Sequence, residues 1–541
     1  MRMARRRWAT LAVAALALPL ALAACGSSGG SSSSPAGSVK VFGCKPQNPL
    51  IPTNTNEVCG GNIVDNVFTN LVNYNPDTAQ PENAVAKSIT SSDQTNWDIK
   101  LNDNYTFTDG TKVTADSFVK AWTWGADQTN AQLNSYFFCN ISGAAAINPQ
   151  TCGSGTGKPT TKTLAGLKVV SPTEFTVRLA SPASSYPVQL GYTAFSPLPA
   201  SFYANPAAFG KKPVGDGPFK IIGGNGDTGF QLQSVDGYVG PDKPKVQFVT
   251  FKTYQSPQAG YADMLANNGS LDLMDQVPPS ALAKNNYQKS FPGRYVNKPV
   301  GVIQTATLPE YVNGYKDPNL GKALSLAIDR PTITAKVFNN GRTPATGWVS
   351  PVVQGYQAGA CDPYCTYNPT EAKSFLAKAT YKGPFSFAYN ADGPGNKEAA
   401  EAICNSIKNA LNVQCTAKAY VDFATFRTAV TAKEMTSMFR TGWQMDWPAM
   451  DDFLAPLYVT NASANDGKYS NPQFDSLITK AAGQTGDASL TTYRQAEQLL
   501  SQDMAIIPLW YQAQQSVWST RVAGVKVTPF STFDLTTVTL K

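Results

Sequence analysis

The chain has 541 residues, of which 42% are hydrophobic and 15% charged, which excludes a disordered acidic tail or a coiled coil and favours a loop-rich globular protein. Histidine is absent, which excludes His-containing catalytic triads, the HExxH metalloprotease helix and His-ligated metal sites, and we expect neither a metal nor a cofactor. The net charge of +7 falls to +3 without the four arginines of residues 2–7, too little to indicate nucleic-acid binding.

The first 24 residues are typical of a secretory signal. The arginines precede an apolar run that is interrupted by Pro19 and is short for a membrane span of about 20 residues. Small residues before Cys25 form a lipobox, so we expect cleavage there and a lipid on Cys25; an uncleaved anchor is the alternative. Residues 25–38 are rich in Gly and Ser and form a flexible tether. The expected location is therefore the extracytoplasmic face of a bacterial cell membrane.

Eight further cysteines, an even number in an oxidising compartment, favour disulfides. A zinc site is the alternative, and it would use Cys361, Cys365, Cys404 and Cys415, although the chain has no CxxC motif. The spacing favours local pairs, although sequence alone does not determine them: Cys44 with Cys59, Cys139 with Cys152, Cys361 with Cys365, and Cys404 with Cys415.

The N-terminal half predicts short strands around a few helices. A strand begins near Val39, and after a loop an apolar helical run extends to Leu71. Alternation predicts strands at 96–101 and 168–179, and Thr114 is expected to cap a helix between them. Residues 217–251 predict a hairpin and another strand. The GxGxxG at 224–229 is expected to be the hairpin loop, since no helix follows it.

Beyond residue 299, helices alternate with strands, which predicts an α/β lobe with a covered sheet. Two lobes that differ in their pattern of helices and strands would place a ligand in the cleft between them. The predicted helices are 320–328, 369–379, 397–411, 423–431 and 490–504, and the predicted strands are 385–389 and 437–440.

Several blocks occur in a characteristic order: FTDGTKVTADSF (107–118), PVGDGPFK (213–220), GSLD (269–272), KALSLAIDR (322–330) and NPTEAKSFL (368–376). Together they resemble the bacterial extracellular solute-binding proteins, family 5, the receptors of oligopeptide and dipeptide ABC importers. The resemblance spans residues 39–541. It implies an α/β type II periplasmic-binding-protein fold with two lobes, hinge strands that cross twice, and a subdomain inserted in the first lobe.

The resemblance also implies domain boundaries, with crossings near Lys298 and Tyr511. The expected parts are lobe I at 39–74, an inserted subdomain at 75–190, lobe I again at 191–298, lobe II at 299–510 and a return to lobe I at 511–541.

The segment FRTGWQMDW (439–447) resembles the Gly-Trp-x-x-Asp segment that lies along the cleft in peptide-binding members. The resemblance implies that its backbone pairs with a peptide and that Asp446 accepts the peptide's α-ammonium. A carboxylate between two indoles is poorly hydrated and prefers a cationic partner; an acid that caps the turn at Pro448 is the alternative. The implied binding residues around Asp446 are Trp443, Gln444, Met445 and Trp447.

Two further residues are candidates. Arg440 matches a position where some members hold the peptide carboxylate, which a guanidinium can bind through two hydrogen bonds; an ordinary surface ion pair is the alternative. Phe423 resembles a side-chain-pocket aromatic, with a core residue as the alternative. The pair Asp451 and Asp452 is expected to be a solvated turn or helix start rather than a catalytic pair.

The predicted function is a monomeric, extracytoplasmic substrate-binding protein that captures short peptides for the permease subunits of an ABC importer, and not an enzyme. One alternative is a binding protein of the same fold for an oligosaccharide, an opine-like compound or a metal chelate. The other is a secreted glycosidase that uses two carboxylates, a chemistry that needs no histidine.

Overall fold

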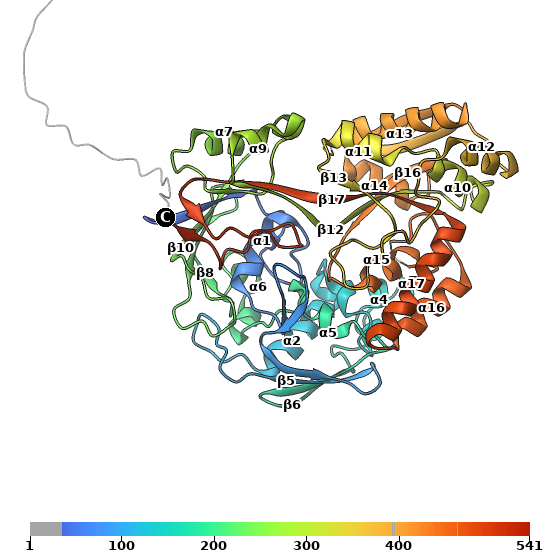
Figure 1. Ribbon diagram of the computed structural model, residues 1–541. Helices are drawn as coiled ribbons and strands as arrows, with labels where there is room; N and C mark the ends of the chain where they lie inside the picture. The colour runs from blue at the N-terminus through green and yellow to red at the C-terminus, as the bar shows by residue number, and fades with distance from the viewer. Residues whose placement is uncertain (1–34, 392, 394, 463) are drawn as a thin grey trace, which may run out of the picture. The chain divides into compact units, whose positions relative to one another are not determined.

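Two long antiparallel strands, β12 (Tyr295–Thr307) and β17 (Ile506–Trp518), run through the middle of the fold (Figure 1). The computed structural model describes residues 35–391, 393, 395–462 and 464–541, so the predicted signal sequence and the lipidation site Cys25 lie outside the described residues. Strand β12 also pairs with β16 (Met438–Gln444), and β17 with β11 (Leu273–Met274). The pair therefore joins two sets of strands into one sheet, ordered β15-β14-β16-β12-β17-β11-β1-β10-β9-β8 with β13 beside β17.

The first set of strands covers one buried core, and we call this part lobe I. The GxGxxG segment forms the tip of the β8–β9 hairpin, which confirms the predicted loop; Gly224 and Gly229 there have φ values of +92° and +107°, a region that favours glycine. The main elements of lobe I are β1 (Ser38–Gly43), α1 (Val58–Val67), β8 (Phe219–Asn225), β9 (Gly229–Ser234), β10 (Phe248–Thr253), α6 (Pro206–Phe209), α7 (Pro257–Ala266), α8 (Pro279–Leu282), α9 (Asn286–Ser290), β18 (Val522–Ala523) and β19 (Thr539–Leu540).

Helix α1 ends at Val67, so the prediction that it extends to Leu71 is wrong. Phe68 is already extended, and the carbonyl of Val67 accepts a hydrogen bond of 2.8 Å from the backbone of Gly217. Asp216 accepts a further bond from the Thr69 backbone. Contacts with a segment almost 150 positions away in the sequence therefore end the helix.

Residues between α1 and β8 form a separate four-stranded sheet in the order β4-β5-β7-β6, packed on α2 (Ala115–Ala126), for which Thr114 is the N-cap as predicted. The strand expected at 168–179 is two strands, because Pro172 lies in the turn between them. The elements of this region are β2 (Val72–Tyr74), β3 (Pro81–Asn83), β4 (Ala86–Thr90), β5 (Asn96–Leu101), α3 (Ala144–Ile147), α4 (Pro149–Cys152), β6 (Leu167–Ser171), β7 (Glu174–Arg178) and α5 (Tyr186–Gln189).

The second set of strands and the helices around it enclose another core, and we call this part lobe II. Here β14 and β15 are parallel, as in an α/β sheet covered by helices. Helices and strands occur at each of the segments predicted beyond residue 299. They are α10 (Pro318–Leu326), α11 (Arg330–Phe338), β13 (Arg342–Pro344), α12 (Pro369–Lys378), β14 (Phe385–Asn390), α13 (Asn396–Leu411), β15 (Cys415–Tyr420), α14 (Phe423–Thr431), α15 (Met450–Tyr458), α16 (Pro472–Ala482) and α17 (Gly486–Asp503).

The cysteines of the described chain are paired in disulfides, which removes the zinc alternative because its four thiols are used. The bonds are Cys44–Cys59, Cys139–Cys152, Cys361–Cys365 and Cys404–Cys415.

The strands β12 and β17 contain the predicted crossing points Lys298 and Tyr511. Contacts group the described residues into one compact unit, so the boundaries at 75, 191, 299 and 511 stay predictions. Over the described residues, every helix is too short or too polar to cross a membrane.

Candidate functional site

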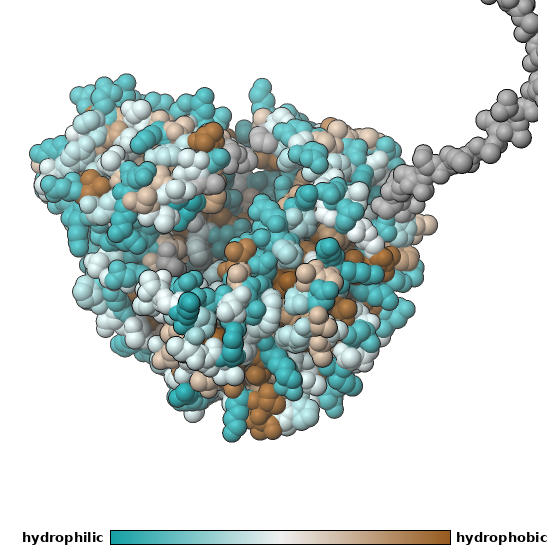
Figure 2. All heavy atoms as spheres, turned by 180° about the vertical axis from the view of Figure 1, so that it is seen from behind, coloured by the Kyte–Doolittle hydropathy of each residue, from teal (hydrophilic) through white to brown (hydrophobic). Residues whose placement is uncertain are grey.

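A cavity of about 810 Å³ lies between the lobes, beside the two crossing strands. Its walls come from α1 and the residues before it in lobe I, and from residues 302–307 and 440–446 in lobe II. Figure 2 shows the surface hollowed between the two lobes. A concave site of this size between two lobes suits a small-molecule or peptide ligand.

The segment that carries the predicted binding residues forms one wall of this cavity. Strand β16 pairs with β12 from Phe439 to Gln444, but it pairs with β14 only at Met438 and Phe439. Residues 442–444 therefore have no second strand partner in the part of the chain that the structure describes. A strand edge of this kind can bind an extended chain through its free N–H and C=O groups.

The residues of this segment lie in different surroundings. Trp443 is half-buried and Gln444 exposed, and both line the cavity. Met445 is 3% exposed, and its sulfur packs so closely on Gly301 that a Cβ there would meet it at 2.1 Å. Met445 therefore supports the cavity wall by packing in the core rather than by presenting its side chain to a ligand.

Trp447 does not line the cavity between the lobes. Its ring packs against Phe137, in the region between α1 and β8, with centroids 6.3 Å apart, and its Nε1 donates to Asp451 at 3.2 Å. Asp451 in turn accepts a hydrogen bond from Ser185 of the same region. Trp447 thus contributes to a contact between lobe II and the region between α1 and β8.

Asp446 is half-buried at the cavity wall, and within the described residues its carboxylate forms no ion pair. Its backbone N–H donates to Asp452 Oδ2 at 3.0 Å. Burial raises the pKa of Asp446 to about 7. An unpaired carboxylate in such surroundings gains most from a cation supplied by a ligand.

Asp452 lies behind Asp446 and is fully buried. Burial, and then the charge of Asp446, raise the pKa of Asp452 well above its ordinary value. Trp443 Nε1 donates to Asp452 Oδ2 at 3.1 Å. Burial and the charge of Asp446 therefore favour the protonated form of Asp452 more strongly than burial favours that of Asp446, which faces the cavity.

The expectation of a solvated Asp451–Asp452 pair is wrong in part. The pair does start a helix, α15, but that helix turns Asp452 into the interior and Asp451 toward Trp447. Adjacent acids after a proline carry no sign of burial in the sequence. Only the packing of α15 against β16 supplies the two N–H donors that hold Asp452.

The other two candidates also line the cavity. Arg440 is half-buried, and its Nη1 donates to Asn390 Oδ1 at 3.1 Å. Burial and then the charge of Arg440 lower the pKa of nearby Arg342 to about 9. Phe423 is 52% exposed at the first turn of α14, so the core alternative is wrong for it.

Sequence reasoning missed the acids of lobe I. Asp65 on α1 and Asp275 after β11 both line the cavity. Asp275 is 7% exposed, and burial raises its pKa to about 7; Asp65 is exposed at the surface of α1 and accepts a hydrogen bond from Thr193. The spacing of Val58, Asn62 and Asp65 along one face of α1 could have indicated Asp65, whereas no pattern indicates Asp275.

Metal binding does not use these acids together. Within the described residues, no group of three or more Cys, Asp or Glu side chains is placed to hold a metal ion.

Known proteins resemble this chain over most of its length. Residues 80–465 match the family described as bacterial extracellular solute-binding proteins, family 5. The oligopeptide-binding protein OppA of Bacillus subtilis is 23% identical over 551 residues, which cover 96% of this chain and 97% of that protein. The periplasmic oligopeptide-binding protein OppA of Haemophilus influenzae is 26% identical over 490 residues, which cover 86% of each.

Solved structures share the fold, which confirms the predicted type II periplasmic-binding-protein architecture. The periplasmic murein tripeptide-binding protein MppA, in an unliganded open form, has a TM-score of 0.78 at 22% identity and covers 93% of this chain and 97% of its own. Haemophilus influenzae OppA in complex with RPPGFSPFR has a TM-score of 0.73 at 23% identity, over 93% and 99%. The chain belongs to the bacterial extracellular solute-binding proteins, family 5.

Proposed function

We propose that this protein binds short peptides in the cavity between its lobes and delivers them to an ABC importer. The observation that carries the proposal is the unpaired carboxylate of Asp446 beside the open edge of β16. Relatives named as oligopeptide-binding and dipeptide-binding proteins support the same class of ligand.

Peptides differ in their side chains and share their main chain. A strand edge pairs with that main chain without selecting side chains, and Asp446 binds the free α-ammonium that starts it. Backbone hydrogen bonds and one desolvated ion pair suffice for micromolar affinity, about −8 kcal/mol.

The remaining candidates have roles at the sides of the ligand. Arg440 lies six residues before Asp446, at the other end of the β16 wall, where it can bind a peptide carboxylate. Phe423 and Gln444 present exposed side chains to the cavity and contact the ligand's side chains.

Binding and release need no covalent step, and the protein acts as a receptor rather than an enzyme. A ligand that bridges α1 and β16 stabilises the closed arrangement of the lobes, which the permease subunits recognise. A lipid on Cys25 would keep the receptor at the membrane surface.

Calorimetric titration with trialanine, N-acetyl-trialanine and maltotriose tests the proposal. The wild type should bind trialanine and neither of the others. Asp446→Asn should weaken trialanine binding roughly 30- to 150-fold, about 2–3 kcal/mol, because the α-ammonium loses its charged partner. Asp227→Asn, an exposed acid that pairs with Lys45 outside the cavity, is the matched control and should bind like the wild type.

Binding of maltotriose, or equal binding of trialanine and its acetylated form, would contradict the proposal. The first result would favour an oligosaccharide receptor of the same fold. The second would remove Asp446 from ligand recognition.

A further inference from the structure

A smaller cavity of about 250 Å³ in lobe I adjoins the main cavity. Both cavities are lined by a common group of side chains, so the two spaces adjoin at these residues, and we call this region the passage. Within the described chain they are Asn62, Asp65, Tyr192, Thr193, Asp275, Asp446, Phe530 and Thr532. A ligand whose amino terminus reaches Asp446 therefore lies at the entrance of the smaller cavity.

The smaller cavity is rich in acidic side chains. Among the described residues its lining includes five aspartates and neither a lysine nor an arginine. Two of the five lie away from the passage, namely Asp242 and Asp534, whereas Asp65, Asp275 and Asp446 lie in it. The main cavity differs, since Arg427 and Arg440 also line it.

One of these acids, Asp275, has a buried oxygen that lacks a hydrogen-bond partner within the described residues. The residue is 7% exposed, and the oxygen is Oδ1. Leaving a carboxylate oxygen buried and unsatisfied is costly, and because Asp275 lines both cavities, a ligand can supply the missing partner. Tyr192, whose pKa is raised by burial and then by the charges of Asp446 and Asp65, lies within the field of both acids.

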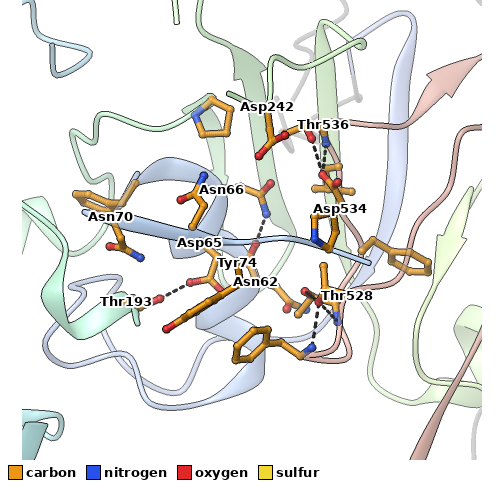
Figure 3. Close-up of a pocket in the computed structure, with 18 of the residues that line it drawn as sticks. Asn62, Asp65, Asn66, Asn70, Tyr74, Thr193, Asp242, Thr528, Asp534 and Thr536 are labelled. Carbon is orange, nitrogen blue, oxygen red and sulfur yellow. Dashed lines mark hydrogen bonds between the residues drawn. The ribbon is translucent and has the colours of Figure 1, made fainter. Parts of the chain in front are cut away.

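Aromatic rings complete the smaller cavity. Tyr74 stacks on Phe530 with centroids 5.0 Å apart, and Figure 3 shows Tyr74 beside Asn62 and Asp65. Aromatic faces cover the methylene stem of a lysine or arginine and attract its charged end, while carboxylates bind that end.

We propose that the smaller cavity is a subsite for a second cationic group of the ligand, the side chain of a lysine or arginine at or next to the peptide's amino terminus, bound by Asp65 and Asp275. The spread of the acids excludes a shared metal ion over the described residues, and the aromatic walls favour an organic cation. This inference rests on the proposed function, because the passage leads from the site of the α-ammonium. The receptor would therefore select basic peptides.

Paired ligands test the subsite. Lys-Ala-Ala and Ala-Lys-Ala are compared with the same peptides carrying norleucine, which keeps the stem and removes the charge. We expect the wild type to bind at least one lysine peptide tenfold or more tightly than its norleucine partner. Asp65→Asn and Asp275→Asn should each reduce this ratio at least threefold, because they weaken binding of the lysine peptides more than binding of their norleucine partners. Asp227→Asn removes the same charge elsewhere and should keep the wild-type ratio.

The outcomes separate the two proposals. A ratio near one for both pairs in the wild type, with trialanine bound, overturns the subsite and leaves the peptide receptor standing. Absence of binding by every peptide overturns the receptor itself. Because buried Asp275 is sensitive to substitution, a thermal melt accompanies each variant; if Asp275→Asn unfolds, the exposed Asp65 decides, and an unchanged ratio in Asp65→Asn contradicts the inference.

Discussion

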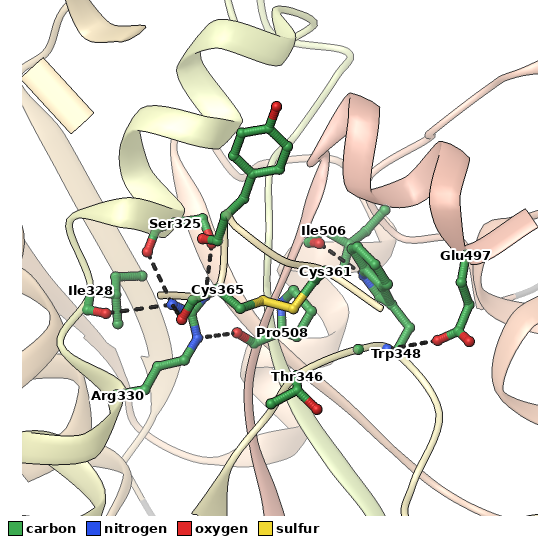
Figure 4. Close-up of a disulfide and its surroundings, with 12 residues drawn as sticks. Ser325, Ile328, Arg330, Thr346, Trp348, Cys361, Cys365, Glu497, Ile506 and Pro508 are labelled. Atoms are coloured by element: carbon green, nitrogen blue, oxygen red, sulfur yellow. Dashed lines mark hydrogen bonds between the residues drawn. A yellow bond between two sulfur atoms is a disulfide. The ribbon is translucent and has the colours of Figure 1, made fainter. Parts of the chain in front are cut away.

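Charged groups in two regions of this protein are buried in opposite ways. In lobe II, Arg330 is fully buried without a carboxylate, and backbone carbonyls surround its guanidinium (Figure 4). Nε donates to Pro508 O at 2.7 Å, Nη1 donates to Ser325 O at 3.0 Å and to Cys365 O at 3.1 Å, and Nη2 donates to Ser325 Oγ at 2.8 Å. In the cleft, by contrast, Asp275 keeps an unsatisfied oxygen and Asp446 has no ion-pair partner among the described residues.

The difference separates structural from functional charge. Arg330 joins α10, α11, the Cys361–Cys365 loop and β17, and every hydrogen bond it makes is within the chain. Asp275 and Asp446 lie instead at the wall of the cavity between the lobes, where a ligand can supply a charged partner.

The largest expected effect on stability comes from replacing Arg330, whose guanidinium is hydrogen-bonded within the chain. Arg330→Met should lower the free energy of unfolding by about 3–5 kcal/mol, because buried carbonyls lose their donors. Urea denaturation measures this, with exposed Arg178→Met as the control, expected within about 0.5 kcal/mol of wild type. Trialanine affinity of the folded variant should be unchanged; a Kd shift above threefold would instead link Arg330 to the ligand.

Stability should also fall as the pH rises. Burial raises the pKa of Asp216 to about 8 and that of Glu497 to about 7, as it does for Asp275. Because these acids ionise near pH 4 when unfolded, the folded state holds more protons between pH 5.5 and 8, so stability is lost as the pH rises through 7–8.

Thermal melts of the ligand-free protein should register this loss, to which Asp216 alone is expected to contribute about 3 kcal/mol between pH 5.5 and 8. Glu497→Gln should flatten the profile, because its side chain no longer titrates. A stability that rises over this interval would show that the acids are ionised in the folded protein.

The disulfide beside Arg330 should have a smaller effect. Cys361 and Cys365 are four positions apart, and a loop this short predicts a loss of about 2 kcal/mol for the double alanine variant. Because Cys365 O accepts from Arg330, combining the variant with Arg330→Met should be non-additive in denaturation experiments. Additive losses would mean that the loop keeps its position without the bond.

The smallest effect on stability is expected in the cleft. Phe423→Ala should change stability by less than about 0.5 kcal/mol, because its ring is 52% exposed. Phe426, one turn further on α14 and 1% exposed, is the matched control and should cost about 3–5 kcal/mol as alanine. If Phe423 supports a ligand side chain, its variant should weaken binding of peptides with large side chains more than that of trialanine.

Much of the local structure follows from sequence alone. Thr114 caps α2, the glycines of 224–229 turn a hairpin, and α14 spans the predicted residues, because capping, turn conformation and apolar periodicity depend on near neighbours. The block order predicted the family, and the Gly-Trp-x-x-Asp segment predicted which wall of the cavity carries Asp446.

Only the tertiary structure decided the surroundings of these residues. The helix α1 ends where Gly217 reaches Val67, and Trp447 turns to Phe137 instead of the cavity. Asp65 and Asp275 meet in one passage although 210 positions separate them in the chain. Periodicity and capping act over a few residues, whereas burial and the pKa of an acid depend on atoms that folding brings from distant segments, so no local pattern encodes them.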